Sequence, residues 1–255
     1  VRLKWYLEES KWSKLDEVDL QSILKEIDKD RELIEKASKG ELREEEKELI
    51  KSALMVVESP NKAKYIALLF GKPAKRRVNG LKVYDVLTEK FLLTLTATGG
   101  HILELITHED RGYYGILEEG NSFKPIFGPI KRCLSCGEDF ISSNQKFCPY
   151  CKSEKIRSKM EVIKNLRKLA LESNLVLIGT DPDMEGEKIA WDLSLILSPY
   201  NKFIYRVTFH EVTRRGLREA LQNLKEVDIN LVKAQLVRRI EDRWLGFELS
   251  RKLWE

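Results

Sequence analysis

The chain has 255 residues, of which 34% are charged, and 45 lysines and arginines against 41 aspartates and glutamates give it a net charge of +4. That length can bury one large core or two smaller ones, and the small basic excess permits a nucleic-acid partner without requiring one. No apolar run approaches the roughly 18 residues that span a bilayer, so we expect a cytoplasmic protein with no membrane partner. The abundance of lysine and glutamate is also typical of proteins from thermophiles.

Residues 1–50 are highly charged and are predicted to form a helical lead-in to the next domain. Asp19 suits an N-cap and Gly40 suits the end of a helix. Because the chain begins on Val1 rather than Met and stops within a helical pattern, we expect it to be part of a longer polypeptide. The apolar side chains at the spacing of one helix face are Leu20, Ile23, Leu24, Ile27 and Ile34.

An apolar run at 53–57 predicts a buried strand that ends on Glu58. Ser59 and Pro60 suit the N-cap and the first position of a helix that would continue to about residue 70. Lys62 lies one turn into this helix, where its charge could neutralise a phosphate. A carboxylate and a lysine are thus expected at the carboxyl end of a strand, which is where sites lie in open parallel sheets.

The next segment supplies a weaker candidate. Residues 72–77 are predicted to form a basic surface loop, and residues 91–98 a strand that ends in two glycines and His101. Glycines let a backbone approach a ligand closely, and His101 could donate to a phosphate. We expect a short helix at 102–106 and loops at 107–128.

Four cysteines come next as two C-x₂-C pairs, separated by eleven residues. Such pairs supply tetrahedral thiolate ligands, so we predict a closed structural Zn²⁺ site in a finger inserted at 129–157. A redox-active pair is the less favoured alternative. Phe140 and Phe147 are expected to pack around the finger. The four ligands would be Cys133, Cys136, Cys148 and Cys151.

The strongest candidate site comes after a predicted helix at 159–173 and a buried strand at 175–178. Asp181 and Asp183 come directly after this strand, and Glu185 and Glu187 lie in or near the first turn of the next helix. Four carboxylates in seven residues repel one another unless a cation lies among them, and Mg²⁺ prefers oxygen ligands. The alternative is a solvated acidic helix start, which the helix dipole favours.

A further strand is predicted at 203–209, then a helix through 224 and a long helix at 228–254. On this last helix Gln235, Arg238, Arg239 and Asp242 share one face. Arginines at that spacing suit phosphate contacts, although on this pattern alone a salt-bridged surface helix is slightly favoured. The alternation of strands and helices from 53 to 210 predicts an α/β fold with a mainly parallel sheet flanked by helices, but it does not fix the strand order.

Several of these blocks together resemble the Toprim domain of type IA DNA topoisomerases over residues 53–254. The blocks begin with Glu58-Ser-Pro-Asn-Lys62, Thr98-Gly-Gly-His101 and Asp181-Pro-Asp183-Met-Glu185. The blocks Arg206-Val-Thr-Phe-His-Glu-Val-Thr213 and Gln235-Leu-Val-Arg-Arg-Ile-Glu-Asp242 come later, in the family's order. The inserted finger, Met184 after the second aspartate and the charged lead-in are most similar to the reverse gyrase branch.

The resemblance implies a Rossmann-like Toprim fold and a role for each matching residue. Glu58, Asp181 and Asp183 would hold Mg²⁺, with Glu185 as a supporting acid. Glu58 would also protonate the leaving 3′ oxygen, and Lys62 would stabilise charge on the phosphate. The residues expected to contact single-stranded DNA are His101, Arg206, Gln235, Arg238, Arg239 and Asp242.

The resemblance also implies a domain division and a limit on activity. Residues 1–50 would trail a helicase-like part that uses ATP, 51–215 would form the Toprim domain, and 216–255 would begin a helical DNA-binding domain. The family's nucleophilic tyrosine belongs to a later domain, so we expect a monomeric chain that cannot cleave DNA without the rest of its polypeptide. The alternatives are a non-catalytic recombination-mediator module, a bacterial-type primase and a purely structural zinc protein.

Overall fold

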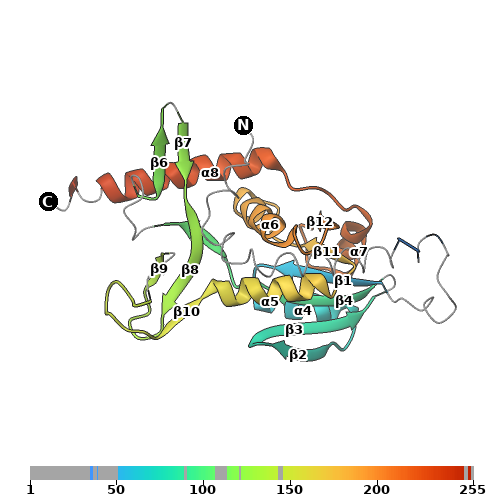
Figure 1. Cartoon of the computed structure of the whole chain (residues 1–255). Coiled ribbons are helices and arrows are strands. Elements are labelled where there is room, and N and C mark those ends of the chain that lie inside the picture. The colour runs from blue at the N-terminus through green and yellow to red at the C-terminus, as the bar shows by residue number, and fades with distance from the viewer. Residues whose placement is uncertain are drawn as a thin grey trace. The chain divides into compact units, whose positions relative to one another are not determined.

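The computed structural model describes residues 51–88, 91–106, 114–120, 122–142 and 146–249, together with 35, 36, 39, 252 and 253 (Figure 1). The helices expected at 1–50 therefore lie almost wholly outside the described residues. The described chain divides into two compact units. The sheet unit comprises 51–100 and 162–227, and the finger unit comprises 101–161 and 228–253. No described helix is long and apolar enough to cross a bilayer.

A six-stranded sheet organises the sheet unit, in the order β12-β11-β1-β4-β3-β2. The four strands β12, β11, β1 and β4 run parallel to one another. Strand β3 runs antiparallel to β4, and β2 runs antiparallel to β3. The mainly parallel α/β sheet is confirmed. The strands are β1 (Ser52–Val57), β2 (Ala74–Val78), β3 (Leu81–Leu87), β4 (Leu92–Ala97), β11 (Leu175–Ile178) and β12 (Ile204–Arg206).

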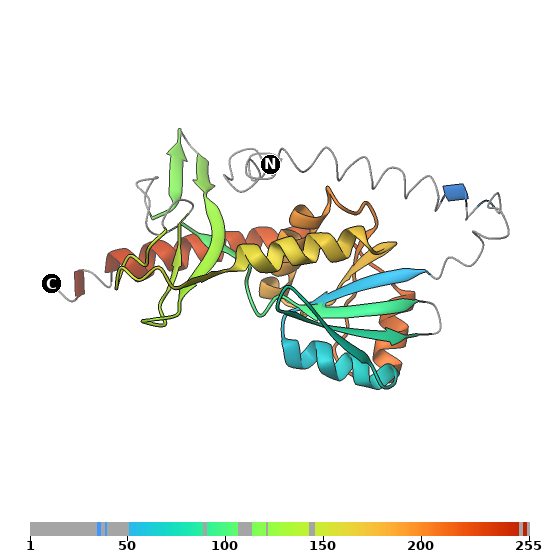
Figure 2. The same ribbon diagram turned by 60° about the horizontal axis from the view of Figure 1, so that its bottom comes forward.

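The central strands are buried on both faces, as their continuous apolar sequences predict. Five consecutive residues of β1 are fully buried, from Ala53 to Val57. Figure 2 shows helices on both sides of the sheet, with α4 and α5 on opposite faces. The helices of this unit are α4 (Pro60–Phe70), α5 (Lys159–Leu171, of which residues from 162 belong here), α6 (Met184–Leu197) and α7 (Arg214–Gln222).

The finger unit is built from short antiparallel strands and one long helix. The central strand β8 pairs with β5, β9 and β10. A separate hairpin joins β6 and β7. The strands are β5 (Leu103–Leu105), β6 (Ile116–Glu119), β7 (Ser122–Pro125), β8 (Phe127–Cys133), β9 (Asp139–Ile141) and β10 (Ile156–Ser158), and α8 (Ile229–Trp244) is continued by a π-helix (Leu245–Leu249).

Three local predictions were wrong. Residues 102–106 contain the strand β5 rather than a helix, because Leu103 and Leu105 are both buried at the alternation of a strand that pairs with β8. Residues 74–78 form the edge strand β2 rather than a loop. Part of the segment expected as loops, 116–125, forms the hairpin of β6 and β7.

Candidate active site and metal centre

Glu58 and Asp181 meet at the carboxyl ends of two adjacent parallel strands. The register pairs Val56 of β1 with Ile178 of β11, so the residues that come after both strands emerge at the same sheet edge. The backbone N–H of Asp181 donates to the Glu58 carboxylate at 2.9 Å. The sheet therefore brings together two carboxylates that are 123 residues apart in the sequence.

The two glycines after β4 hold the backbone of Glu58. The N–H groups of Gly99 and Gly100 donate to the Glu58 carbonyl at 2.8 and 3.1 Å. Both glycines have positive φ values, 70° and 94°, which residues with a Cβ seldom adopt. The close backbone approach that the glycines predict is thus made to the site's own glutamate in this structure.

Lys62 supplies a positive charge to this pair of carboxylates. Its Nζ lies 2.6 Å from Asp181 Oδ1, and its side chain is only 13% exposed. Nζ also lies 5.0 Å from the centre of the Phe209 ring, a favourable cation–π distance. One turn of helix after Ser59 is therefore enough to place the lysine at the strand ends.

The electrostatics of the pair are asymmetric. Burial raises the pKa of Glu58 above 4.5, and its hydrogen bond with Asp181 raises it further. The pKa of Asp181 is lowered from 3.8 by its hydrogen bond with Glu58 and then by that with Lys62. As pH falls, Glu58 therefore takes up a proton before Asp181 does, which makes Glu58 the better proton donor.

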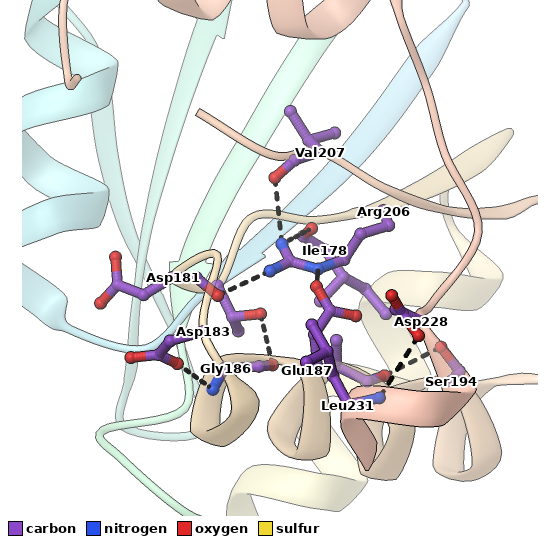
Figure 3. Close-up of polar contacts among 12 residues, drawn as sticks. Ile178, Asp181, Asp183, Gly186, Glu187, Ser194, Arg206, Val207, Asp228 and Leu231 are labelled. Atoms are coloured by element: carbon purple, nitrogen blue, oxygen red, sulfur yellow. Dashed lines mark hydrogen bonds and ion pairs between the residues drawn. The ribbon is translucent and has the colours of Figure 1, made fainter. Parts of the chain in front are cut away.

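Asp183 is placed differently from the other two acids. It is the N-cap of α6, and its Oδ1 accepts from the Gly186 N–H at 2.6 Å (Figure 3). Both Asp183 and Glu185 are exposed at the start of this helix. Within the described residues, only the four cysteines form a group of three or more donors at metal-binding distances. Glu58 and Asp181 are thus in direct contact, whereas the Asp183 carboxylate bonds to the backbone of its own helix.

Arg206 lies beneath this turn rather than on a DNA-binding surface. It is 1% exposed, and its Nε donates to the Glu187 carboxylate at 2.8 Å (Figure 3). Nη1 donates to the carbonyls of Ile178 and Val207 at 3.0 Å, and Nη2 donates to that of Asp181 at 2.8 Å. Since this buried network uses all three nitrogens, we withdraw Arg206 from the expected DNA contacts. It positions the Asp181 backbone instead.

Gly186 is a residue of this site that the sequence reasoning missed. A Cβ at this position would lie 2.0 Å from the Asp181 carbonyl oxygen, a distance that no side chain tolerates. The Thr180 hydroxyl donates to the Gly186 carbonyl at 2.7 Å and closes the same turn. The available signal was a glycine in the first turn of a helix, where it weakens the helix unless close packing requires it.

The four cysteines of the finger unit converge as their spacing predicts. Their sulfur atoms all lie within 4.8 Å of one another, with Cys133 and Cys151 at 3.5 Å and Cys136 and Cys148 at 3.6 Å. No disulfide joins them. Tetrahedral Zn–S bonds of about 2.3 Å place sulfur atoms roughly 3.8 Å apart, so the arrangement fits Zn²⁺.

The residues around the four cysteines support a zinc site in part. The backbone N–H of Cys136 lowers the pKa of Cys133 to about 6, which favours a thiolate at that position, whereas burial and the neighbouring thiols raise the pKa values of Cys136 and Cys151 in the metal-free finger. Phe140 is fully buried against Cys133 and Cys148, as predicted. Phe147 is 49% exposed, so the expectation that it packs around the cysteines was wrong.

Two of the four residues predicted on one face of α8, Gln235 and Arg239, are buried or paired with other residues of the protein. Arg239 pairs with Glu104 of β5 at 2.9 Å and lies 3.5 Å from His101 Nε2. Arg238 and Asp242 are more than half exposed and 3.8 Å apart. Gln235 is only 6% exposed, so its side chain is not accessible to a strand in this structure and we withdraw it as a DNA contact.

The model of the Toprim domain family matches residues 53–212, which is more than half of the chain. The chain belongs to the Toprim family. The match includes the strands that carry Glu58 and Asp181, and it also spans the four cysteines.

The same region has close relatives among reverse gyrases. The chain is 49% identical over its whole length to a reverse gyrase from Pyrococcus horikoshii and 48% identical to one from Pyrococcus furiosus. It spans only 16% and 21% of the length of those proteins. The solved structure of full-length topoisomerase I from Thermotoga maritima is 29% identical, with a TM-score of 0.51 over 79% of this chain and 26% of that chain. The chain thus has its counterparts in reverse gyrases and in a topoisomerase I.

Proposed function

We propose that this chain is the Toprim part of a reverse gyrase. In the whole protein it would act with Mg²⁺ on single-stranded DNA, in strand cleavage, passage and religation that give ATP-dependent positive supercoiling. The whole-length identity to two reverse gyrases supports this family assignment. The single observation that carries the chemistry is the contact of Glu58, Asp181 and Lys62 at the strand ends.

Glu58, Asp181 and Asp183 would hold Mg²⁺, with Glu185 as a supporting acid. Carboxylate oxygens are the ligands that this ion prefers, and the second oxygen of Asp183 has no hydrogen bond among the described residues. A bound ion would supply positive charge to the oxygens of a scissile phosphate. Lys62 already lies at Asp181 and would add a second positive charge there.

Glu58 would also give a proton to the leaving 3′ oxygen of the cleaved strand. Its raised pKa supports this role, because a carboxyl group that keeps its proton closer to neutral pH is a better general acid. Arg206 would serve by holding the Asp181 turn in place.

We keep four residues as proposed contacts to single-stranded DNA, namely His101, Arg238, Arg239 and Asp242. Arg238 is the most accessible arginine of this set, and Asp242 would orient it. Cys133, Cys136, Cys148 and Cys151 would hold Zn²⁺ in a closed site that does no chemistry. Residues 51–215 are our proposed Toprim domain, with the finger at 129–157, and 216–255 begin the helical DNA-binding domain. We propose a cytoplasmic monomer.

The recombination-mediator alternative combines the same two parts, a Toprim domain and a four-cysteine finger, without catalysis. The identity to reverse gyrases extends over the entire chain, including α8, and this favours the topoisomerase assignment.

Titration of Mg²⁺ into the chain tests the carboxylate site. Asp181→Asn and Glu58→Gln should each weaken Mg²⁺ binding by more than about tenfold, because each removes a charged ligand. The affinity of the original chain should rise with pH as Glu58 loses its proton, and this rise should be reduced in Glu58→Gln. Isothermal titration calorimetry at several pH values measures both effects.

Glu172→Gln is the matched control, because Glu172 is an exposed acid in the same unit whose side chain is outside the site. It should bind Mg²⁺ as the original chain does. Unchanged binding in both site variants would exclude the proposed site.

A second experiment tests the predicted inactivity of the isolated chain. Incubated with Mg²⁺ and a labelled single strand, the chain should form no covalent adduct with DNA, since the resemblance places the nucleophilic tyrosine in a later domain. Denaturing gel electrophoresis detects such an adduct. The addition of a segment carrying that tyrosine should restore the adduct, and an adduct formed by the chain alone would contradict the assignment.

A further inference from the structure

The sheet unit carries a second polar surface, outside the carboxylate site. A groove of about 460 Å³ is lined by residues of the N-terminal half of α4 and of the hairpin of β2 and β3, elements that Figure 1 labels. We call it the basic groove. Its lining residues are Pro60, Asn61, Lys64, Lys75, Arg76, Arg77, Lys82, Val83 and Tyr84.

The strand register directs three of these cations into the groove. Lys75 pairs with Tyr84 and Arg77 pairs with Lys82, and residues that oppose each other in an antiparallel pair share a face. Tyr84 belongs to the core cluster that includes the buried residues of α4. Lys75, Arg77 and Lys82 therefore project from the face that α4 covers, and Lys64 joins them from α4 itself.

Arg76 of the same hairpin has a structural role, because its charge is paired with a carboxylate of the protein. Arg76 borders the groove, but strand alternation directs its side chain to the other face from Lys75 and Arg77. Its Nε lies 2.6 Å from Asp85, and the Thr94 hydroxyl donates to the same carboxylate at 2.8 Å. The four groove cations (Lys64, Lys75, Arg77 and Lys82) are exposed, and none has an ion pair with a carboxylate in the described part of the chain. No carboxylate of the described residues therefore compensates their charge.

A protective role for the edge strand explains only part of this pattern. Lysines on an exposed edge strand such as β2 discourage pairing with other chains. That reason does not apply to Lys82 of the inner strand β3 or to Lys64 of a helix. Cations from three elements converge on one concavity, where their mutual repulsion disfavours the arrangement unless an anion occupies it.

We propose that the basic groove binds the phosphodiester backbone of a nucleic-acid strand. A backbone carries one charge per nucleotide, and positioning contacts to phosphates come mainly from lysine and arginine. Of the three apolar or aromatic lining residues, Val83 and Tyr84 are buried and only Pro60 is exposed, so the groove offers no large apolar anchor of the kind that peptide binding uses.

The position of the groove gives the strand a direction. Pro60 and Asn61 line it and come two and three residues after Glu58, so the groove begins beside the carboxylate site and extends to the sheet edge. A strand held at the carboxylates would continue along the groove. This inference rests on the proposed function, which supplies the strand, and adds a path for its backbone that the metal-site residues do not provide.

The salt dependence of DNA binding tests the groove directly. The four cations are replaced together, as Lys64→Gln, Lys75→Gln, Arg77→Gln and Lys82→Gln, and binding of a labelled 20-nucleotide single strand is followed by fluorescence anisotropy without added Mg²⁺. The slope of log K against log salt concentration should fall by about 3, since each lost phosphate contact removes roughly 0.7 to 0.9. Arg77→Gln alone should reduce the slope by a little under about 1.

A charge-matched variant controls for the net charge. It replaces four exposed lysines of the same unit that do not line the groove, Lys164, Lys168, Lys202 and Lys225, with glutamine. Its slope should stay near that of the original chain. An unchanged slope in the groove variant, or an equal loss in both variants, would overturn the proposal.

Two further experiments distinguish this proposal from binding of an acidic peptide and from the metal-site proposal. An oligo-glutamate peptide replaces the DNA in one arm. If the groove variant loses affinity for the peptide and not for DNA, the groove holds an acidic protein segment and the proposal is wrong. In the other arm, the groove variant is titrated with Mg²⁺ and should bind the ion as the original chain does, so a failure of the groove and a failure of the metal site give different results.

Discussion

Replacing Arg206 with methionine is expected to destabilise the sheet unit by about 3 to 5 kcal/mol, the usual cost of removing one partner of a buried ion pair. The variant leaves the Glu187 carboxylate buried without its cation. It also removes the donors to the carbonyls of Ile178, Val207 and Asp181. Urea unfolding followed by circular dichroism measures the change in the free energy of unfolding.

Two variants show whether the buried charge is the cause. Arg215→Met removes an arginine with the same Nε–carboxylate geometry, 2.9 Å from Glu219, but this pair is exposed and should not change stability measurably. The double variant Arg206→Met with Glu187→Met should regain part of the loss, because no unpaired charge remains. If the double variant were as unstable as the sum of its two single variants, the ion pair would not be the source of the effect.

Removal of zinc is expected to unfold the finger and to leave the six-stranded sheet intact. Among the described residues, the apolar cluster around the cysteines contains only Cys133, Cys148, Phe140 and Ile156, which is too few to hold β8, β9 and β10 together without metal. The main core is formed by other residues, from the strands and from α4 and α7. Hydrogen exchange with and without a strong chelator should show lost protection at 129–157 and retained protection in β1, β4 and β11.

Cysteine variants make the same test without a chelator. Cys133→Ser and Cys148→Ser should lower the zinc content from one ion per chain to nearly none, because each removes a buried ligand. Ser135→Ala is the matched control. It removes a hydroxyl 2.7 Å from that of Ser153 in the same finger but no ligand, so it should retain zinc. Loss of protection across the whole sheet on zinc removal would mean that the finger supports the main core.

Local sequence patterns predicted the elements that position the site. Ser59 and Pro60 gave the start of α4, and the apolar run before Asp181 gave β11 with its bounds. The cysteine spacing was equally informative, because two C-x₂-C pairs have few structural uses. Such signals are strong because the cause lies within a few residues of the effect.

The remaining features depend on contacts between distant residues. Arg206 and Glu58 are both charged residues at strand ends. Arg206 is buried and holds the backbone of the site, whereas the Glu58 carboxylate lies in the site itself. Nothing in the local sequence separates these two outcomes. The segment 102–106 was mistaken for a helix because so short an apolar run fits both the helical and the strand periodicity. Only the pairing of β5 with β8 shows that it is a strand. The basic segment at 74–78 looked like a loop because its partner, β3, lies across a turn.

The contact of Lys62 with Asp181 has a consequence for how the site fills and empties. The ammonium group occupies one oxygen of the aspartate, so an arriving ion meets a neutralised carboxylate and must share or displace the lysine. Entry then exchanges one cation for another and gains less free energy than entry into bare acids. We therefore expect occupancy to vary with the free Mg²⁺ concentration in a graded way. The sheet should remain folded when the ion leaves.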